Sequence, residues 1–280
     1  VTKMGLVFLF ERETGKPLFP IEERPVPQSD IPGEELWPTQ PFPVKPPPLN
    51  RLAFTEDQIT NLSPEAHAAV KEVWGRSRAG RIYTPPSKEG TIVHPGFRGG
   101  VLWGGCSFDP ELNHLFVNSD ENTNRITLAD AGENKAWRYD LPERIRLYDP
   151  EGYPAIKPPW GYLTAIDLDR GDFVWRVVTG EFPELKARGI APTGTPSNGG
   201  SIATAGGLVF FAGTFDAKFR AFDSRTGRLL WEYQLDAAGY ATPCTYEAGG
   251  KQYVVIAAGG GKGFTTPGDQ FVAFALPDQA

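Results

Sequence analysis

The clearest pattern of apolar and polar positions lies between residues 198 and 231. Apolar and β-branched runs are separated there by glycine-rich or Asp/Thr-Gly turns, which is typical of β-hairpins. The pattern predicts four consecutive strands in one antiparallel sheet: Ser201–Thr204, Leu208–Gly213, Phe219–Phe222 and Leu229–Tyr233. Strands this short, joined by turns this tight, are typical of one unit in a repeating all-β architecture.

Part of this unit recurs along the chain. An acidic residue is followed four positions later by glycine and four positions after that by an aromatic residue: Asp223-Gly227-Trp231, Asp167-Gly171-Trp175 and, more weakly, Glu11-Gly15-Phe19. The glycine can take the positive φ that a tight turn needs, and the aromatic residue then falls on the returning strand, where it can pack against a neighbouring sheet. The repetition predicts a β-propeller.

The same reasoning predicts further strands. They are two strands within 1–19 around the turn at Gly15, two within 99–119 around residues 109–113, a hairpin within 160–180, a hairpin within 241–258, and a lone last strand at 270–276. In a closed propeller the lone strand would be joined by one from elsewhere, commonly the N-terminus, because closure removes exposed edges. The count gives roughly three and a half blades, so the chain alone would leave edges unpaired.

Two segments interrupt the repeat, and the chain reads as one propeller domain over 1–280 with insertions at about 20–98 and 120–159. Residues 20–48 are rich in proline, which predicts an extended strap without ladder pairing, or else a flexible linker. A helix is predicted within 54–74, with Thr55 or Ser63 as its N-cap and His67 on its exposed face. Residues 120–159 are charged and weakly periodic, and we expect this segment to leave the repeat and cross one face of the propeller disc.

Composition narrows the function classes. The chain has 280 residues with 32 Gly, 27 Pro and a net charge of −6, which fits a turn-rich all-β protein and argues against a nucleic-acid partner. Cys106 and Cys244 are too few for a disulfide framework, and we expect both to pack as small apolar residues. His67, His94 and His114 lie far apart without metal-ligand spacing. No apolar run approaches the length of a membrane span.

Several motifs in a fixed order carry a family resemblance. They are TKMGLVFLFERETGKPLFPIEERPVP, TPPSKEGTIVHPG, LWGGCSFDP, GGSIATAGGLVFFAGTFDAKFRAFDSRTGRLLW and ATPCTYEAGGKQYVVIAAGGG. Together they resemble the C-terminal blades of the quinoprotein dehydrogenases that use pyrroloquinoline quinone (PQQ), nearest to the membrane-bound glucose and quinate branch. The resemblance implies an all-β fold, a partial β-propeller with about three to four blades of an eight-bladed wheel. It covers nearly the whole chain.

The resemblance also implies three cofactor-binding residues. Lys3 would contact the ortho-quinone, where a cation stabilises negative charge on a quinone oxygen. Trp103 would lie at the cofactor pocket, and Asn118 would hydrogen-bond quinone or carboxylate oxygens. The plainer alternatives are a surface lysine, a core tryptophan and an asparagine that closes a turn.

Departures from the family pattern limit what is carried over. Leu102 stands where relatives usually have Glu or Asn, and Gly261 stands where the glucose branch often has His, so glucose specificity is not inherited. In the family the catalytic Asp and the calcium or magnesium ligands lie upstream of Lys3. We therefore expect the chain to be part of a longer protein and to be inactive in isolation.

Two functions remain open from the sequence. The first is the C-terminal part of a PQQ-dependent dehydrogenase that oxidises a sugar or alcohol by hydride transfer to the quinone. It would be periplasmic, with or without a membrane anchor in an absent N-terminal region, and its partners would be the missing N-terminal half of the propeller and a ubiquinone or cytochrome acceptor. The second is a non-catalytic β-propeller that serves as a scaffold or interaction module, which Leu102 and Gly261 favour.

Overall fold

The computed structural model describes residues 1–101, 104–133 and 135–277. The chain forms two compact units. Unit 1 is Val1–Gly100 with Glu121–Trp160, and unit 2 is Val101–Asp120 with Gly161–Ala280. Each unit has its own sheets and its own core. No helix in the described ranges is long and apolar enough to cross a membrane.

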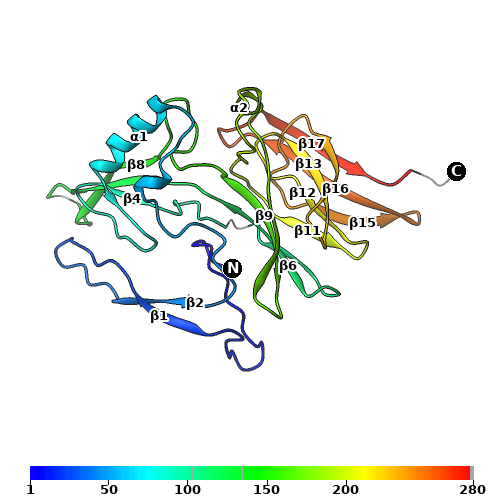
Figure 1. The fold of residues 1–280 in the computed structure, drawn as a ribbon, viewed down its shortest axis with the longest axis horizontal. Helices are drawn as coiled ribbons and strands as arrows, with labels where there is room; N and C mark the ends of the chain where they lie inside the picture. The colour runs from blue at the N-terminus through cyan, green and yellow to red at the C-terminus, as the bar shows by residue number, and fades with distance from the viewer. Residues whose placement is uncertain (102–103, 134, 278–280) are drawn as a thin grey trace. The chain divides into compact units, whose positions relative to one another are not determined.

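Unit 2 is built from three antiparallel sheets (Figure 1). The first has the order β10-β9-β6-β5, with β5 (Cys106–Asp109), β6 (His114–Asp120), β9 (Gly161–Asp167) and β10 (Asp172–Val178). The second has the order β11-β12-β13-β14, with β11 (Ser201–Thr204), β12 (Leu208–Phe211), β13 (Lys218–Asp223) and β14 (Leu229–Gln234). The third has the order β15-β16-β17, with β15 (Cys244–Ala248), β16 (Lys251–Gly260) and β17 (Pro267–Phe274). The short helix α2 (Pro183–Ala187) lies between the first and second sheets along the chain.

The repeated acidic-Gly spacing forms the predicted turns. The Asp223 carboxylate accepts hydrogen bonds from the backbone N–H groups of Arg225 (3.0 Å) and Thr226 (2.9 Å), and Gly227 has a φ of +70°. Asp167 caps the equivalent turn between β9 and β10 in the same way, and Gly171 has a φ of +67°. The turns form because an Asx cap satisfies the loop amides and glycine removes the penalty of the left-handed conformation.

Apolar residues between neighbouring sheets hold unit 2 together. One buried cluster joins the first sheet to the second: Phe116, Leu163, Ala165, Val209, Phe211 and Phe222. Another joins the second sheet to the third: Ala212, Phe219, Leu235, Val254, Ile256 and Ala258. Each sheet thus packs face to face on the next, as blades do, and the predicted all-β partial propeller is confirmed.

Unit 1 contains a four-stranded sheet in the order β3-β4-β7-β8. Its strands are β3 (Arg78–Ala79), β4 (Thr91–Val93), β7 (Asn124–Asp130) and β8 (Tyr139–Arg146). The expectation that residues 120–159 form only an excursion was wrong, because this segment supplies β7 and β8. The charged residues of this segment obscured the apolar alternation that marks a strand. In the structure they pair across the two strands, where Arg125 of β7 forms an ion pair with Glu143 of β8.

The proline-rich segment also pairs, contrary to the sequence prediction. β1 (Ile21–Pro25) and β2 (Thr39–Pro43) form an antiparallel two-stranded sheet. Backbone bonds from the Val26 N–H to the Pro38 carbonyl (3.1 Å) and from the Val44 N–H to the Pro20 carbonyl (2.9 Å) fix which residue pairs of the ladder are hydrogen-bonded. Since hydrogen-bonded pairs alternate with non-bonded pairs, Pro25, Pro41 and Pro43 fall on non-bonded positions, where a missing N–H costs no ladder bond.

The helix prediction is confirmed in its main points. The short 3₁₀ helix η1 (Glu56–Gln58) begins after Thr55, and α1 (Pro64–Gly75) begins after Ser63, whose hydroxyl accepts a bond from the Ala66 N–H at 3.0 Å. His67 is half-buried rather than exposed, because its Nδ1 lies 3.0 Å from the Thr60 carbonyl oxygen.

Three further expectations need correction. Residues 1–19 form a short hairpin around the turn at Gly15, with backbone bonds from Glu11 to the Lys16 carbonyl and from Leu18 to the Leu9 carbonyl, both 2.9 Å. The pairing is limited to a bridge between Phe10 and Pro17 and does not extend into two full strands. The last strand is not alone, since β17 pairs with β16. Cys106 and Cys244 lie on strands as expected, but both are exposed rather than packed in the core.

Candidate cofactor site

Lys3 of unit 1 lies in a turn at the start of the chain. The Gly5 N–H donates to the Thr2 carbonyl at 2.9 Å, and the buried side chain of Leu6 anchors the segment that follows. The Lys3 side chain is exposed, and its Nζ donates to the carbonyl oxygen of Phe97 at 2.7 Å. Within the described part of the chain, no carboxylate lies within ion-pair distance of this ammonium group, so its remaining N–H donors are available to a ligand.

The loop that receives Lys3 is itself fixed by asparagine side chains. Asn124 Oδ1 accepts a hydrogen bond from the Phe97 N–H, and Asn122 Nδ2 donates to the Gly99 carbonyl, both at 2.8 Å. The Gly100 N–H then donates to the Lys3 carbonyl at 2.7 Å. Gly99 has a φ of +84°, and a Cβ there would lie 2.9 Å from the Lys3 Cβ. The position of Lys3 therefore depends on a glycine that no other residue replaces without strain.

A buried polar network precedes this loop. His94 Nδ1 lies 3.1 Å from the Thr123 hydroxyl and Nε2 lies 3.1 Å from a Glu121 carboxylate oxygen. The other Glu121 oxygen accepts from the Arg51 backbone N–H at 3.1 Å. Burial raises the pKa of Glu121, but the hydrogen bond to His94 and the charges of His94 and Arg51 outweigh it and hold that pKa below its usual value. The sequence did not predict this network, since its members are scattered along the chain.

Asn118 of unit 2 lies near the end of β6 and is 2% exposed. Its Nδ2 donates to the Ser197 hydroxyl oxygen at 3.1 Å and points at the Gly199 carbonyl at 3.4 Å. Ser197 in turn donates its hydroxyl to the buried Asp120 carboxylate at 2.8 Å. Because a carboxylate only accepts, this chain of bonds fixes the direction of the Asn118 amide.

Glycines bring backbone segments close together beside Asn118. A Cβ on Gly104 would lie 2.1 Å from the Gly199 carbonyl carbon, and the Thr242 hydroxyl donates to the Gly104 carbonyl at 3.3 Å. The start of β5 therefore approaches the start of β11 more closely than a residue with a side chain allows. Leu102 and Trp103 lie outside the described residues, and the role predicted for Trp103 stays a prediction.

The described residues fit an anionic, oxygen-rich cofactor in part. The Lys3 ammonium suits negatively charged or carbonyl oxygens. Asn118 directs its amide hydrogens at protein oxygens, and its Oδ1 makes no hydrogen bond within the described residues, so it offers a ligand an acceptor rather than a donor. Lys3 and Asn118 belong to different units, and their assignment to a cofactor stays a prediction. No group of three or more His, Cys, Asp or Glu side chains that could hold a metal occurs among the described residues.

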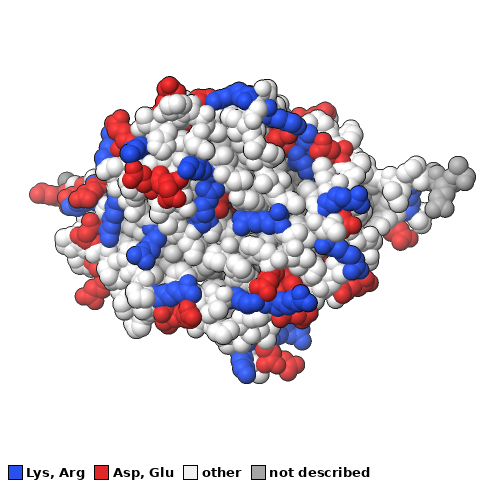
Figure 2. Space-filling view, in the orientation of Figure 1, with Lys and Arg blue, Asp and Glu red and all other residues white. Residues whose placement is uncertain are grey.

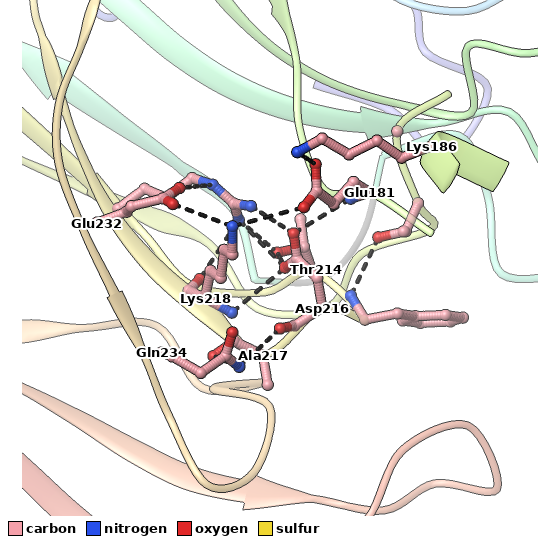
Figure 3. Close-up of polar contacts among 12 residues, drawn as sticks. Glu181, Lys186, Thr214, Asp216, Ala217, Lys218, Glu232 and Gln234 are labelled. Atoms are coloured by element: carbon pink, nitrogen blue, oxygen red, sulfur yellow. Dashed lines mark hydrogen bonds and ion pairs between the residues drawn. The ribbon is translucent and has the colours of Figure 1, made fainter. Parts of the chain in front are cut away.

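A second network that the sequence did not predict lies in unit 2 (Figure 3). Asp216 pairs with Arg220, and their side chains are only 3% and 8% exposed. Lys218 lies between Glu232 (3.0 Å) and Glu181 (3.5 Å). The hydrogen bond to Glu232 raises the pKa of Lys218. The Asp216 and Arg220 spacing of four residues was visible in the sequence, but its burial was not.

Charged side chains of both signs are interspersed on the face seen in Figure 2. Such a mixed surface gives no extended field of one sign to attract a polyanion. The expectation that the chain has no nucleic-acid partner stays a prediction.

Comparison with known proteins identifies the family. Residues 1–254 match the PQQ family model described as "Glucose/ethanol/alcohol dehydrogenase, beta-propeller domain". The chain belongs to this family. The match covers all the sheets of both units except the third sheet's last strand and the end of β16.

Relatives of known name align with nearly all of the chain. The chain is 35% identical to quinoprotein glucose dehydrogenase A of Acinetobacter calcoaceticus, over 99% of this chain and 38% of the relative. It is 35% identical to a probable quinate dehydrogenase of Xanthomonas campestris pv. juglandis, over 99% and 38%. It is 36% identical to the glycerol dehydrogenase large subunit of Gluconobacter oxydans, over 99% and 42%. The chain thus spans about two fifths of the length of these relatives.

Solved structures agree with the fold. The quinohemoprotein alcohol dehydrogenase of Pseudomonas putida HK5 matches 68% of this chain and 28% of its own, with a TM-score of 0.53 and 25% identity. A europium-containing methanol dehydrogenase matches 92% of this chain and 35% of its own, with a TM-score of 0.53 and 20% identity, and supports the fold alone.

Proposed function

We propose that this chain is the C-terminal portion of a PQQ-dependent dehydrogenase that oxidises a sugar or an alcohol. The relatives named above, which act on glucose, quinate or glycerol by their names, support this class of reaction. The observation that carries the proposal for this chain is the Lys3 ammonium, which is held in place by the Phe97 carbonyl and has no carboxylate partner among the described residues.

When present, PQQ would supply the acceptor for the hydride that leaves the carbon bearing the substrate hydroxyl. Lys3 would place a fixed positive charge beside the quinone, and a preorganised cation stabilises developing negative charge without reorganisation. The Asn118 side chain is aligned by Ser197 and Asp120, and it presents its Oδ1 to an N–H or O–H donor of the ligand.

We further propose that the general base and the calcium or magnesium ligands come from outside these 280 residues. The isolated chain would then bind the quinone weakly and would not turn over substrate. The electron acceptor of the whole enzyme would be ubiquinone or a cytochrome, and its location would be periplasmic, with a membrane anchor outside this chain.

Titration of the chain with PQQ, in the presence of calcium or magnesium, tests the assignment of Lys3. We expect Lys3→Ala to weaken binding by about tenfold, since a charge-assisted hydrogen bond contributes about 1.5–3 kcal/mol. Lys16→Ala is the matched control, because Lys16 is also exposed but lies in the Gly15 turn. Equal affinities of the two variants would refute the role of Lys3, and dye reduction by the unmodified chain with an aldose or alcohol would refute its inactivity.

One observation favours the alternative, a non-catalytic propeller module that binds other proteins. Apolar side chains are exposed on β14, β15 and β17, including Trp231, Tyr233, Tyr246 and Phe271, the last 82% exposed. Exposed aromatic residues are enriched at protein interfaces. Failure of a version extended upstream to bind PQQ would favour this module over the dehydrogenase.

A further inference from the structure

Asn50 of unit 1 packs against both the turn that carries Lys3 and the loop that receives the Lys3 side chain. Its own side chain is buried, since Asn50 is only 5% exposed. A Cβ on Gly5 would lie 3.0 Å from the Asn50 Cγ, and a Cβ on Gly100 would lie 2.7 Å from the Asn50 Nδ2. The carboxamide therefore occupies space that exists only because both of these positions are glycine.

The turn on one side of Asn50 is closed by its own hydrogen bonds. The Thr2 N–H donates to the Leu6 carbonyl at 2.9 Å, and the Leu6 N–H donates to the Thr2 hydroxyl oxygen at 3.2 Å. The Gly5 carbonyl accepts a hydrogen bond from the N–H of Leu49, which is fully buried, at 2.8 Å. Because Leu49 directly precedes Asn50, the whole turn, with Lys3 inside it, is tied to the position of Asn50.

The loop on the other side of Asn50 holds both ends of Lys3. The Gly100 N–H donates to the Lys3 carbonyl, and the Phe97 carbonyl accepts from the Lys3 Nζ, both at 2.7 Å. Gly100 thus contacts Lys3 through its N–H and contacts Asn50 at the position where a side chain would begin. A change in the size of residue 50 would displace Gly100 and, with it, the loop that holds the Lys3 ammonium.

The residue that follows Asn50 is anchored in the core of unit 1. The Arg51 N–H donates to a carboxylate oxygen of Glu121 at 3.1 Å, and Glu121 is only 1% exposed. The Arg51 guanidinium donates to the carbonyl oxygens of Lys157 (2.8 Å) and Pro159 (3.0 Å). The chain is therefore fixed both before and after Asn50, so this residue acts as a rigid spacer between the turn and the loop.

A rigid spacer at this place matters because lysine is a flexible side chain. Its ammonium lies at the end of a four-carbon stem, and ordering that stem when a ligand binds costs entropy. The Lys3 side chain is exposed to a ligand, while its backbone and its ammonium are already held by Gly100 and Phe97. An ammonium that is ordered before binding costs less to engage, so Asn50 raises the affinity for an anionic oxygen without touching it.

We propose that Asn50 is a positioning residue for Lys3. Its carboxamide sets the separation between the Lys3 turn and the loop at Gly99 and Gly100, and so holds the ammonium in place to meet an oxygen of PQQ. The proposal rests on the proposed function, because it deepens the role that Lys3 has there. It requires the size of the side chain at position 50 to match the missing side chain at position 100.

An exchange of side-chain size between positions 50 and 100, measured by PQQ titration, tests this match. Asn50→Ala leaves a gap and should weaken PQQ binding by about threefold to tenfold. Gly100→Ala should weaken it similarly, because the added methyl group overlaps the Asn50 carboxamide, whereas its φ lies outside the left-handed region and adds no strain. The double variant should bind PQQ more tightly than either single variant, because the methyl group enters the gap.

Asn61→Ala and Gly132→Ala are the matched controls and should leave the affinity unchanged. Asn61 is exposed, and nothing lies within 4 Å of the Cβ position of Gly132. In a Lys3→Ala background, neither Asn50→Ala nor Gly100→Ala should weaken binding further. Gly100→Ala also covers the case in which Asn50→Ala fails to fold. Variants that lose unfolding free energy but keep the affinity of the unmodified chain would show a merely structural role and overturn the proposal.

Acetylation by acetic anhydride, read by peptide mass spectrometry, tests the position of Lys3 without any cofactor. Lys3 should react more slowly than Lys16, because its ammonium donates to the Phe97 carbonyl. Asn50→Ala should raise the rate at Lys3 relative to Lys16 by about threefold, and the double variant with Gly100→Ala should lower it again.

An unchanged rate at Lys3 in both single variants would overturn the proposal whether or not PQQ binds. The expected rates together with no PQQ binding by the unmodified chain would refute the proposed function and leave the positioning of Lys3 by Asn50 supported.

Discussion

Trp175 of β10 packs on Gly227, the turn glycine of the neighbouring sheet. Its indole Nε1 donates to the Ser224 carbonyl at 3.0 Å, and a Cβ on Gly227 would lie 2.7 Å from the indole ring. The aromatic residue of one repeat thus docks on the acidic-Gly turn of the next. Trp231 contacts the third sheet differently, since the centroid of its ring lies 5.0 Å from that of the Phe274 ring on β17. The Trp175–Gly227 contact thus links the repeated sequence spacing to the stacking of the sheets.

Gly227→Ala should destabilise the chain more than an alanine at an uncrowded turn glycine. The substitution forces a side chain into a left-handed conformation and against Trp175, for a combined cost of about 2–4 kcal/mol. Gly249→Ala is the control, because Gly249 also has a positive φ, +60°, but nothing lies within 4 Å of its Cβ position, so only the conformational cost of about 1–2 kcal/mol applies. Urea unfolding of both variants measures the difference. Equal losses would show that Trp175 does not dock there.

The His94–Glu121 contact should make stability depend on pH in the acid range. The folded pKa of Glu121 is lowered, so its contribution is fully present above the unfolded pKa of about 4.3 and is lost as pH falls through the folded pKa. Glu121→Gln should lower the unfolding free energy near pH 7 by about 3–5 kcal/mol, because it removes the buried carboxylate that His94 and the half-buried Arg51 face.

Unfolding free energies measured from pH 7 to pH 3 check this expectation. The Glu121→Gln variant should lose less stability than the unmodified chain over that range. Glu23→Gln, which changes an exposed carboxylate on β1, should follow the unmodified chain. A Glu121→Gln curve that runs parallel to that of the unmodified chain would mean that Glu121 does not carry the acid sensitivity.

Asn122 should affect the affinity for PQQ indirectly, by holding the loop that positions Lys3. Asn122→Ala removes the hydrogen bond to the Gly99 carbonyl and loosens the loop that fixes Lys3. If Lys3 binds PQQ, we expect about a threefold loss of affinity for Asn122→Ala, and a double variant with Lys3→Ala no weaker than Lys3→Ala alone. PQQ titration of the four proteins gives the coupling. Additive losses would indicate that Asn122 acts elsewhere.

Removing one member of the Asp216–Arg220 pair should lower the unfolding free energy more than the double variant does for each residue changed. Arg220→Met leaves the buried Asp216 without its cation, and Asp216→Asn leaves Arg220 with only the more exposed Glu232 at 3.7 Å, so each single variant should destabilise the chain by about 3–5 kcal/mol. The double variant should lose less than the sum of the single variants, by about 1–3 kcal/mol. Thermal or urea unfolding measures this coupling. The exposed pair of Lys71 and Glu56 provides the comparison, since its coupling should stay below about 1 kcal/mol.

Sequence reasoning succeeded where structure is local. The Asp223 cap and the Gly227 turn involve neighbours in the chain, so their spacing predicted β13 and β14 within a residue or two at each end. The same holds for Ser63 at the start of α1. It failed where pairing is distant. β4 pairs with β7, which lies about thirty residues further along the chain. The prolines of β2 are tolerated only because they fall on the residue pairs that exchange no hydrogen bonds.

The candidate site divides in the same way. Lys3 and Asn118 were picked out by motif, but only the structure showed that Phe97 holds the Lys3 ammonium and that Ser197 takes the Asn118 amide. The network around His94 left no signal in the sequence, because Arg51, His94 and Glu121 are scattered along the chain.

By itself the sequence determined the repeating strands, their turns and the family, since these depend on residues a few positions apart. The tertiary structure decided which strands pair in unit 1 and which charges are buried. Those features depend on contacts between segments tens of residues apart, whose hydrogen bonds and desolvation form only once the sheets have packed.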